Sequence, residues 1–153
     1  MTTLHLGVID MPYAQAPARL RARRVSGTQT TGDVAEILEA KYHVMELFYE
    51  ENAQFVADKV SESLQGALES LMMGAGNAAQ IDPFGGATSE IEDRFKQFLS
   101  MKEVEKLGIP GVPTKAALRG VNHRLKHPYR RRGARPSFVD TSLYMSSFKA
   151  WAT

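Results

Sequence analysis

The sequence predicts an α+β protein that is predominantly helical, with one long amphipathic helix, two or three shorter helices, an extended N-terminal arm and room for a small β-sheet. Three observations carry this prediction. Apolar residues recur at steps of three and four from residue 33 into the seventies. Capping residues and Gly or Pro stops then divide the rest of the chain into short helical segments. At 153 residues the chain has the length of a single domain.

Residues 1–31 are predicted to form the extended arm. Pro12, Pro17 and the Ser, Gly and Thr residues of 26–32 disfavour a helix there. The short apolar run at 4–9 is consistent with one or two short strands. Arms of this kind often become ordered only on a neighbouring subunit. Residues 32–153 form the single helix-rich domain in this interpretation.

The long helix is expected to begin at Asp33, which forms a capping-box pattern with Glu36. No Pro or Gly interrupts the pattern before Gly66, which predicts one helix of about forty residues and about 60 Å. A helix of this length either kinks or presents its apolar stripe to another chain. The stripe contains Val34, Ile37, Leu38, Met45, Phe48, Phe55, Val56, Val60, Leu64, Leu68, Leu71 and Met72.

Shorter helices are expected after the stop at 74–77. Thr88 or Ser89 is a candidate cap for a second helix through Leu99, and Ser100 for a short continuation that reaches Leu107.

Two more helices are predicted towards the C-terminus. Thr114 is the expected cap of a third helix that continues through Leu125 and is stopped by Pro128. Asp140 or Thr141 caps a last helix, in the segment 137–153 that we predict to dock on a neighbour or on the chain's own core. Its candidate assembly anchors are Asp140, Leu143, Phe148 and Trp151.

Charge is strongly segregated along the chain. Residues 1–31 carry four basic side chains and one acidic one, residues 32–105 carry five basic and fifteen acidic, and residues 106–153 carry ten basic and one acidic. The net charges are therefore +3, −10 and +9. Such a distribution can steer an oppositely charged partner, including another copy of the same chain.

No catalytic, cofactor or metal site is predicted. The chain has no cysteine, and Gly74-Ala75-Gly76 lacks the strand–helix context of a phosphate-binding loop. His123 and His127 have the spacing of two metal ligands on a helix, but Pro128 follows directly and cations surround them. His5 and His43 show no partner pattern. We therefore expect no enzymatic activity, no cofactor and no bound metal.

The basic linker 119–136 has two interpretations. It can grip the acidic face of a neighbouring subunit, which we favour, or it can contact nucleic-acid phosphates. The side chains concerned are Arg119, Arg124, Lys126, Arg130, Arg131, Arg132 and Arg135. The sequence shows neither a signal peptide nor an apolar stretch of about 18 residues, so we expect no membrane association.

The C-terminal segment Arg135-Pro136-Ser137-Phe138-Val139-Asp140-Thr141-Ser142-Leu143-Tyr144-Met145-Ser146-Ser147-Phe148-Lys149-Ala150-Trp151 resembles a motif of small tailed-bacteriophage virion proteins. In the tail-completion and head–tail joining group that motif reads P-x-[FL]-[VI]-D-T-G-x-[LY]-x-x-S-[FI], and Ser142 stands here in place of its glycine. The order of a long helix, a basic linker and the D-T motif is similar as well.

The resemblance implies a mixed fold with helices beside a small sheet. It also implies a structural virion component that is assembled in the host cytoplasm and forms a cyclic homo-oligomer in the neck. Other neck, portal-adjacent or tail proteins would be its partners, with non-specific DNA contact in the lumen. The alternative is a different class of function, a basic nucleic-acid-binding protein that acts through residues 119–135.

Overall fold

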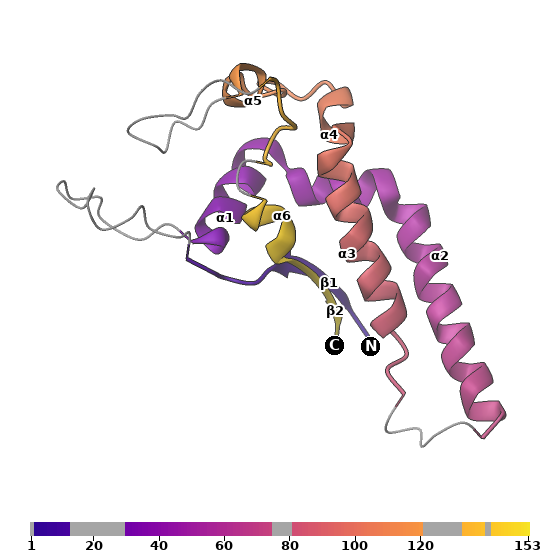
Figure 1. Ribbon diagram of the computed structural model, residues 1–153. Helices are drawn as coiled ribbons and strands as arrows, with labels where there is room; N and C mark the ends of the chain where they lie inside the picture. The colour runs from indigo at the N-terminus through magenta and orange to yellow at the C-terminus, as the bar shows by residue number, and fades with distance from the viewer. Residues whose placement is uncertain (1, 13–29, 75–80, 121–132, 140–141) are drawn as a thin grey trace.

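The computed structural model describes residues 2–12, 30–74, 81–120, 133–139 and 142–153. They form a predominantly helical α+β fold with a two-stranded sheet, which confirms the predicted fold class. Figure 1 shows α2 and α3 side by side along one edge of the molecule, with the sheet and α6 beside α3. The elements in chain order are β1 (Leu4–Val8), α1 (Thr31–Tyr42), α2 (Val44–Met72), α3 (Gly85–Ser100), α4 (Glu103–Lys106), α5 (Lys115–Arg119), α6 (Leu143–Ser147) and β2 (Phe148–Ala152).

The sheet joins the two ends of the described chain. β1 pairs antiparallel with β2, from Leu4 opposite Ala152 to Val8 opposite Phe148. The predicted strand in the arm is thus present, but it becomes ordered within its own chain and not on a neighbour. The part of the arm at 13–29 lies outside the described residues.

The prediction of one forty-residue helix from Asp33 is wrong, because the chain turns at His43. This residue has left-handed backbone angles, with φ 51°, and it separates α1 from α2. The first helix also starts earlier than predicted. Thr30 caps it: the Thr30 hydroxyl accepts a hydrogen bond from the Asp33 N–H at 3.2 Å, and the Asp33 carboxylate accepts one from the Thr30 N–H at 2.9 Å.

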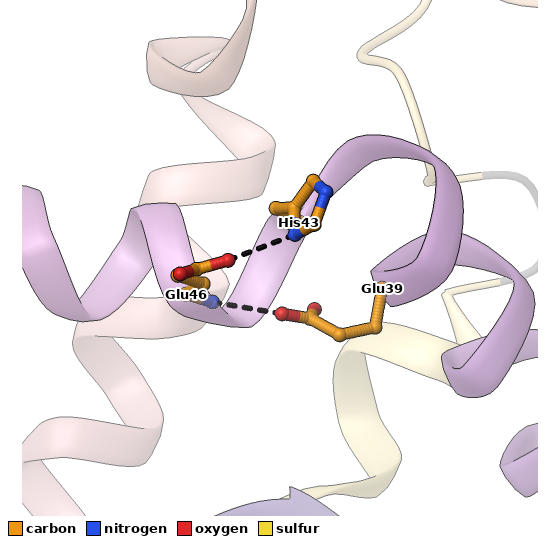
Figure 2. A group of neighbouring side chains, drawn as sticks. All are labelled: Glu39, His43 and Glu46. Carbon is orange, nitrogen blue, oxygen red and sulfur yellow. Dashed lines mark hydrogen bonds and ion pairs between the residues drawn. The ribbon is translucent and has the colours of Figure 1, made fainter.

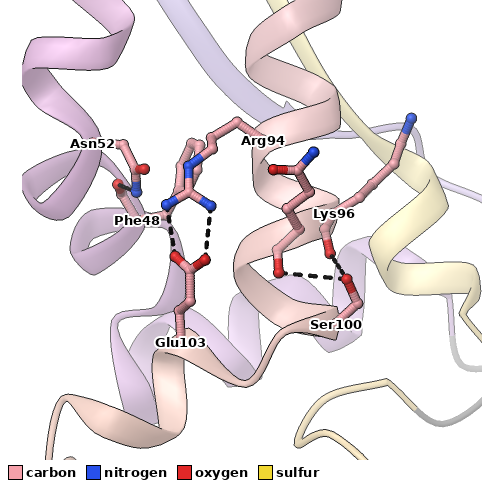
Figure 3. Close-up of polar contacts among 7 residues, drawn as sticks. Phe48, Asn52, Arg94, Lys96, Ser100 and Glu103 are labelled. Atoms are coloured by element: carbon pink, nitrogen blue, oxygen red, sulfur yellow. Dashed lines mark hydrogen bonds and ion pairs between the residues drawn. The ribbon is translucent and has the colours of Figure 1, made fainter.

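A second departure from helical geometry lies inside α2 at Asn52, where φ is −119°. The Asn52 side chain is buried and donates to the Phe48 carbonyl at 2.8 Å, as Figure 3 shows. The backbone at Asn52 therefore bends the helix. The buried Asn52 amide finds its hydrogen-bond acceptor one turn earlier in the same helix.

The next two helices start at other residues than predicted. α3 begins at Gly85, so that Thr88 lies in its first turn instead of capping it. α4 begins only after Lys102, whose left-handed backbone separates it from α3, and Ser100 is the last residue of α3.

Thr114 is confirmed as a helix cap, since its hydroxyl accepts from the Ala117 N–H at 3.2 Å. However, α5 ends at Arg119, and the residues of its predicted continuation to Leu125 lie beyond Gly120, outside the described ranges. Gly120 adopts φ 61°, a left-handed conformation that ends helices and that glycine adopts without a steric cost.

The predicted C-terminal helix is half correct. α6 covers Leu143–Ser147, but Phe148 is already extended and the chain continues as β2. Phe148 and Trp151 therefore do not share a helical face: Phe148 is buried and Trp151 is partly exposed. Ser142, at the position of the motif glycine, adopts φ 60° and makes the left-handed turn before α6. The predicted caps Asp140 and Thr141 lie outside the described residues.

Four phenylalanine rings from three elements form the centre of the core. Phe95 of α3 stacks on Phe148 of β2 with 3.9 Å between ring centroids. Phe48 of α2 meets Phe95, Phe98 and Phe148 edge-on at 5.1 to 5.9 Å. All four side chains are buried, so this cluster fixes α2, α3 and the sheet relative to one another.

An ion pair joins α3 to α4. The Arg94 guanidinium donates to both carboxylate oxygens of Glu103, at 3.0 and 2.6 Å (Figure 3). These hydrogen bonds are the main cause that lowers the pKa of Glu103 below its ordinary value of 4.5. The pair consequently contributes stability above the pKa of the unfolded carboxyl, and this contribution is lost as the pH falls through the lower folded pKa.

We predict that Arg94→Gln lowers the free energy of unfolding by about 1 kcal/mol at neutral pH. The difference from wild type should shrink towards zero in acid, where Glu103 is protonated in both states. Urea unfolding at a series of pH values measures this difference in the free energy of unfolding. Lys96→Gln is the control, because it removes one charge from the same helix, and the ion pair of Lys96 with the exposed Asp93 spans only three residues of one helix. An Arg94→Gln difference that stays constant with pH would contradict the assignment.

Candidate assembly surfaces

The C-terminal half of α2 exposes a row of large apolar side chains. Leu64, Leu68, Leu71 and Met72 have exposed fractions of 43%, 58%, 42% and 79%. Steps of three and four residues place them on one side of the helix. We call these four residues the α2 flank.

The α2 flank is exposed because α3 covers a different face of the same helix. The buried side chains of α2 include Phe48, Asn52 and Val56, and Ser63 lies beside Gly86 of α3. At 100° per residue, Leu64 is rotated by about 80° from Val56 around the helix axis. The flank therefore lies beside the packed face and not under it.

The outward face of α2 is acidic. The helix carries six carboxylates and one basic side chain, Lys59. The Lys59 ammonium is paired with Glu62 at 2.8 Å and with Glu90 of α3 at 3.0 Å, and these contacts raise the pKa of Lys59. Asp58, Glu62 and Glu69 are exposed and spaced as one further row of the helix. An apolar row and an acidic row thus run next to each other.

The predicted basic contacts are only partly described. Arg119 is exposed at the end of α5. Arg135 is half-buried, and its guanidinium donates to the Val139 carbonyl at 2.8 Å while its backbone N–H donates to the Ala117 carbonyl at 3.1 Å. Its side chain therefore contacts its own chain through at least one guanidinium nitrogen, and its role as a partner contact stays a prediction. Outside the described residues lie Arg124, Lys126, Arg130, Arg131 and Arg132.

The predicted assembly anchors differ in position. Phe148 is fully buried in its own core, so it is a packing residue and not an anchor on another chain. Leu143 is half-buried at the start of α6. Trp151 is 44% exposed and stacks on His5 across the sheet, with 5.4 Å between ring centroids. The fourth, Asp140, lies outside the described residues.

A group that the sequence analysis missed lies at the break between α1 and α2. Figure 2 shows Glu39, His43 and Glu46 pointing towards one another, with ligand atoms that all lie within 4.8 Å. The His43 Nδ1 is 2.8 Å from a Glu46 carboxylate oxygen. Their spacing of four and then three residues would have predicted a shared face.

Helix capping explains this group. The Glu39 carboxylate accepts from the backbone N–H groups of Met45 and Glu46, at 2.8 and 3.1 Å. These donors belong to the first turn of α2, where backbone N–H groups have no hydrogen-bond acceptor within the helix itself. A cation bound there would also sit at the positive end of the α2 dipole, which disfavours it. The geometry thus favours a cap that stabilises the turn at His43.

The sequence matches no protein-family model, and it matches no curated protein and no solved structure. Separately, none of the helices in the described ranges combines the length and the apolar character that crossing a bilayer requires.

Proposed function

We propose that this chain is a structural virion protein of a tailed phage, a ring-forming subunit of the neck, head–tail connector or tail-completion region that acts by subunit–subunit assembly. The observation that carries the proposal is the α2 flank next to an acidic row, in a chain whose residues 106–139 contain nine basic side chains and no acid. Both surfaces are of the kind that proteins use to bind other proteins.

The apolar part of this contact supplies affinity. Monomers rarely leave a contiguous row of large aliphatic side chains exposed on one helix. Full burial of one such side chain contributes about 1.5–3 kcal/mol, so four of them supply a substantial part of an interface.

The charged part of the contact supplies specificity and direction. The acidic row is on α2 and the basic segment is elsewhere in the sequence, so the contact joins two different surfaces of two copies. Heterologous contacts of this kind close into rings when the rotation between copies permits it. The expected ring therefore has acidic and basic surfaces that alternate around its axis.

The phage assignment is supported by the C-terminal motif. Its resemblance to the tail-completion and head–tail joining group loses little from Ser142, because Ser142 adopts the left-handed backbone that glycine adopts most easily. Helices beside a small sheet are also what the resemblance implied. Partners would then be further copies and the adjoining neck, portal-adjacent or tail proteins.

The alternative proposal is a nucleic-acid-binding protein that acts through residues 119–135. It is favoured by the exposed Arg119 at the end of α5 and by the acid-free stretch that follows it. In an assembled ring the same segment can contact DNA in the lumen without sequence specificity.

Self-association of the purified chain tests the proposal. Mass photometry and electron microscopy should show closed rings, and Leu68→Glu with Met72→Glu should reduce them to smaller species. Met101→Glu is the matched control, since Met101 is 69% exposed but lies outside the α2 flank. Rings that persist in the double variant would contradict the role of the flank.

The phage role and the alternative need their own measurements. The chain should be found by mass spectrometry in purified particles and located at the neck by cryo-electron microscopy. Duplex DNA binding that falls steeply with salt, and that is lost when Arg130, Arg131 and Arg132 become alanine in a chain that forms no ring, would favour the alternative.

A further inference from the structure

The outer edge of β1 carries backbone groups that face away from its partner strand β2. Thr3 and Thr153 exchange both backbone hydrogen bonds, at 2.8 and 3.0 Å, and the Ile9 N–H donates to the Ser147 carbonyl at 2.8 Å. In an antiparallel pair such residues alternate with residues whose N–H and C=O groups point away from the partner strand. The backbone groups of Leu4, Leu6 and Val8 consequently point away from β2.

The two edges of the sheet are not equivalent. On the β2 side, Glu92 of α3 accepts from the Ala150 N–H at 3.3 Å and from the Lys149 ammonium at 2.7 Å. A carboxylate thus occupies that edge. On the β1 side, no described residue hydrogen-bonds to the outward backbone groups of Leu4, Leu6 or Val8. An open row of this kind is a template for another strand.

The side chains of β1 lack the charges with which proteins usually protect an open edge. Residues 2–9 contain no acidic side chain and no Lys or Arg. One face of β1 packs Leu4, Leu6 and Val8 against the core, where they remain only partly buried. On the other face Ile9 is 49% exposed and Trp151 is 44% exposed beside His5. A strand added at this edge would therefore cover apolar surface on both faces.

We propose that this edge binds the β1 strand of a second copy, antiparallel, about a two-fold axis at Leu6. The result is a four-stranded sheet in the order β2–β1–β1–β2. Leu6 pairs with Leu6 of the partner subunit, and Leu4 pairs with Val8 of the partner subunit. Every outward N–H between Leu4 and Val8 then meets an outward carbonyl.

A second copy fits this edge for two reasons. First, the outward residues Leu4, Leu6 and Val8 are arranged symmetrically around Leu6, so one two-fold operation satisfies all of them at once. Second, the register sets His5 opposite Gly7 of the partner subunit. Gly7 is covered by the ring of Trp151 in its own chain, since a Cβ there would lie 2.9 Å from that ring. The stacked His5 and Trp151 rings of the two copies would therefore adjoin across the axis.

This contact goes beyond the proposed ring and does not depend on it. A two-fold contact joins two copies face to face, whereas the α2 flank joins copies head to tail. The two can therefore fail separately. If both exist, the β1 contact links two rings back to back.

Sedimentation equilibrium tests the proposal, with all variants made in the Leu68→Glu background so that the α2 flank does not contribute. Leu6→Pro removes one outward N–H without touching the hydrogen bonds to β2, a position at which edge strands accept proline. We expect the dimer Kd to rise by about 10- to 100-fold, since each dimer loses two hydrogen bonds. Leu6→Ala is the matched control, because it shortens the same side chain but keeps the N–H. Equal Kd values for the two variants would overturn the proposal.

A distance measurement tests the register without altering the edge. The chain has no cysteine, so Ile9→Cys introduces a single site for a spin label at an exposed position. In the proposed dimer the two labelled positions are six residues apart along adjacent strands, which is about 20 Å. Electron–electron double resonance should report this distance. A sample that remains monomeric at several hundred micromolar, or a dimer with a clearly different distance, would overturn the proposal.

Discussion

Phe48→Ala is expected to lower the free energy of unfolding by about 3–5 kcal/mol, the largest effect of any single substitution considered for this chain. Phe48 is fully buried and its ring touches three other buried rings, from α3 and β2. Truncation removes apolar burial and leaves a cavity between two helices and the sheet. In a domain at the low end of ordinary stability, about 5 kcal/mol, a loss of this size leaves a substantial fraction of molecules unfolded.

Chemical denaturation followed by circular dichroism measures this loss. The control is Tyr49→Ala at the next position, since Tyr49 is 50% exposed and its truncation should cost far less. Similar losses for the two variants would show that the aromatic cluster is not the centre of the fold.

Glu105→Ala is expected to have the second-largest effect, about 2–3 kcal/mol. One Glu105 carboxylate oxygen accepts from both the N–H and the hydroxyl of Ser137, each at 2.8 Å. The Ser137 hydroxyl in turn accepts from the Thr114 N–H at 3.1 Å. Ser137 is fully buried, so the loss of Glu105 leaves polar groups without partners where water does not reach.

Thermal unfolding of a matched set of variants measures this contribution. Glu105→Gln keeps an acceptor oxygen and should retain much of the stability, whereas Ser137→Ala should resemble Glu105→Ala. If Glu105→Gln were as damaging as Glu105→Ala, charge and not hydrogen bonding would be the main term.

The helical content of the fold could be predicted from the sequence because it follows from local apolar spacing. The apolar positions around Phe48 and Val56 do face the core, as the three- and four-residue steps indicate. The break at His43 was not predicted, because no Gly or Pro marks it. It depends on the Glu39 carboxylate, which caps a helix that begins five residues later.

The C-terminal strand illustrates a different limit of local patterns. Phe148 and Trp151 are three residues apart, and this spacing alone does not decide between a helix and a short strand. The partner strand that decides the matter is at the other end of the sequence, at Leu4–Val8. Strand formation is set by such distant pairing more than by the residues themselves.

The candidate surfaces were predicted in part. The acidic middle of the sequence becomes the outward face of α2, as charge segregation suggested. Spacing alone could not distinguish the exposed apolar residues from Leu64 to Met72 from the buried apolar residues of the same helix, because both sets follow the same helical period. Arg135 could not be separated from its basic neighbours, because only the fold turns its guanidinium towards Val139.

The long-range sheet also affects how the chain folds during synthesis. His5 and Thr153 are in contact although they are 148 positions apart in the sequence. Closing so large a loop has a high entropic cost, and contacts of this range slow folding. On the ribosome, the first strand must therefore wait until residues 148–152 have emerged before it can pair with them. During that interval its uncharged residues are open to chaperones and to other nascent chains.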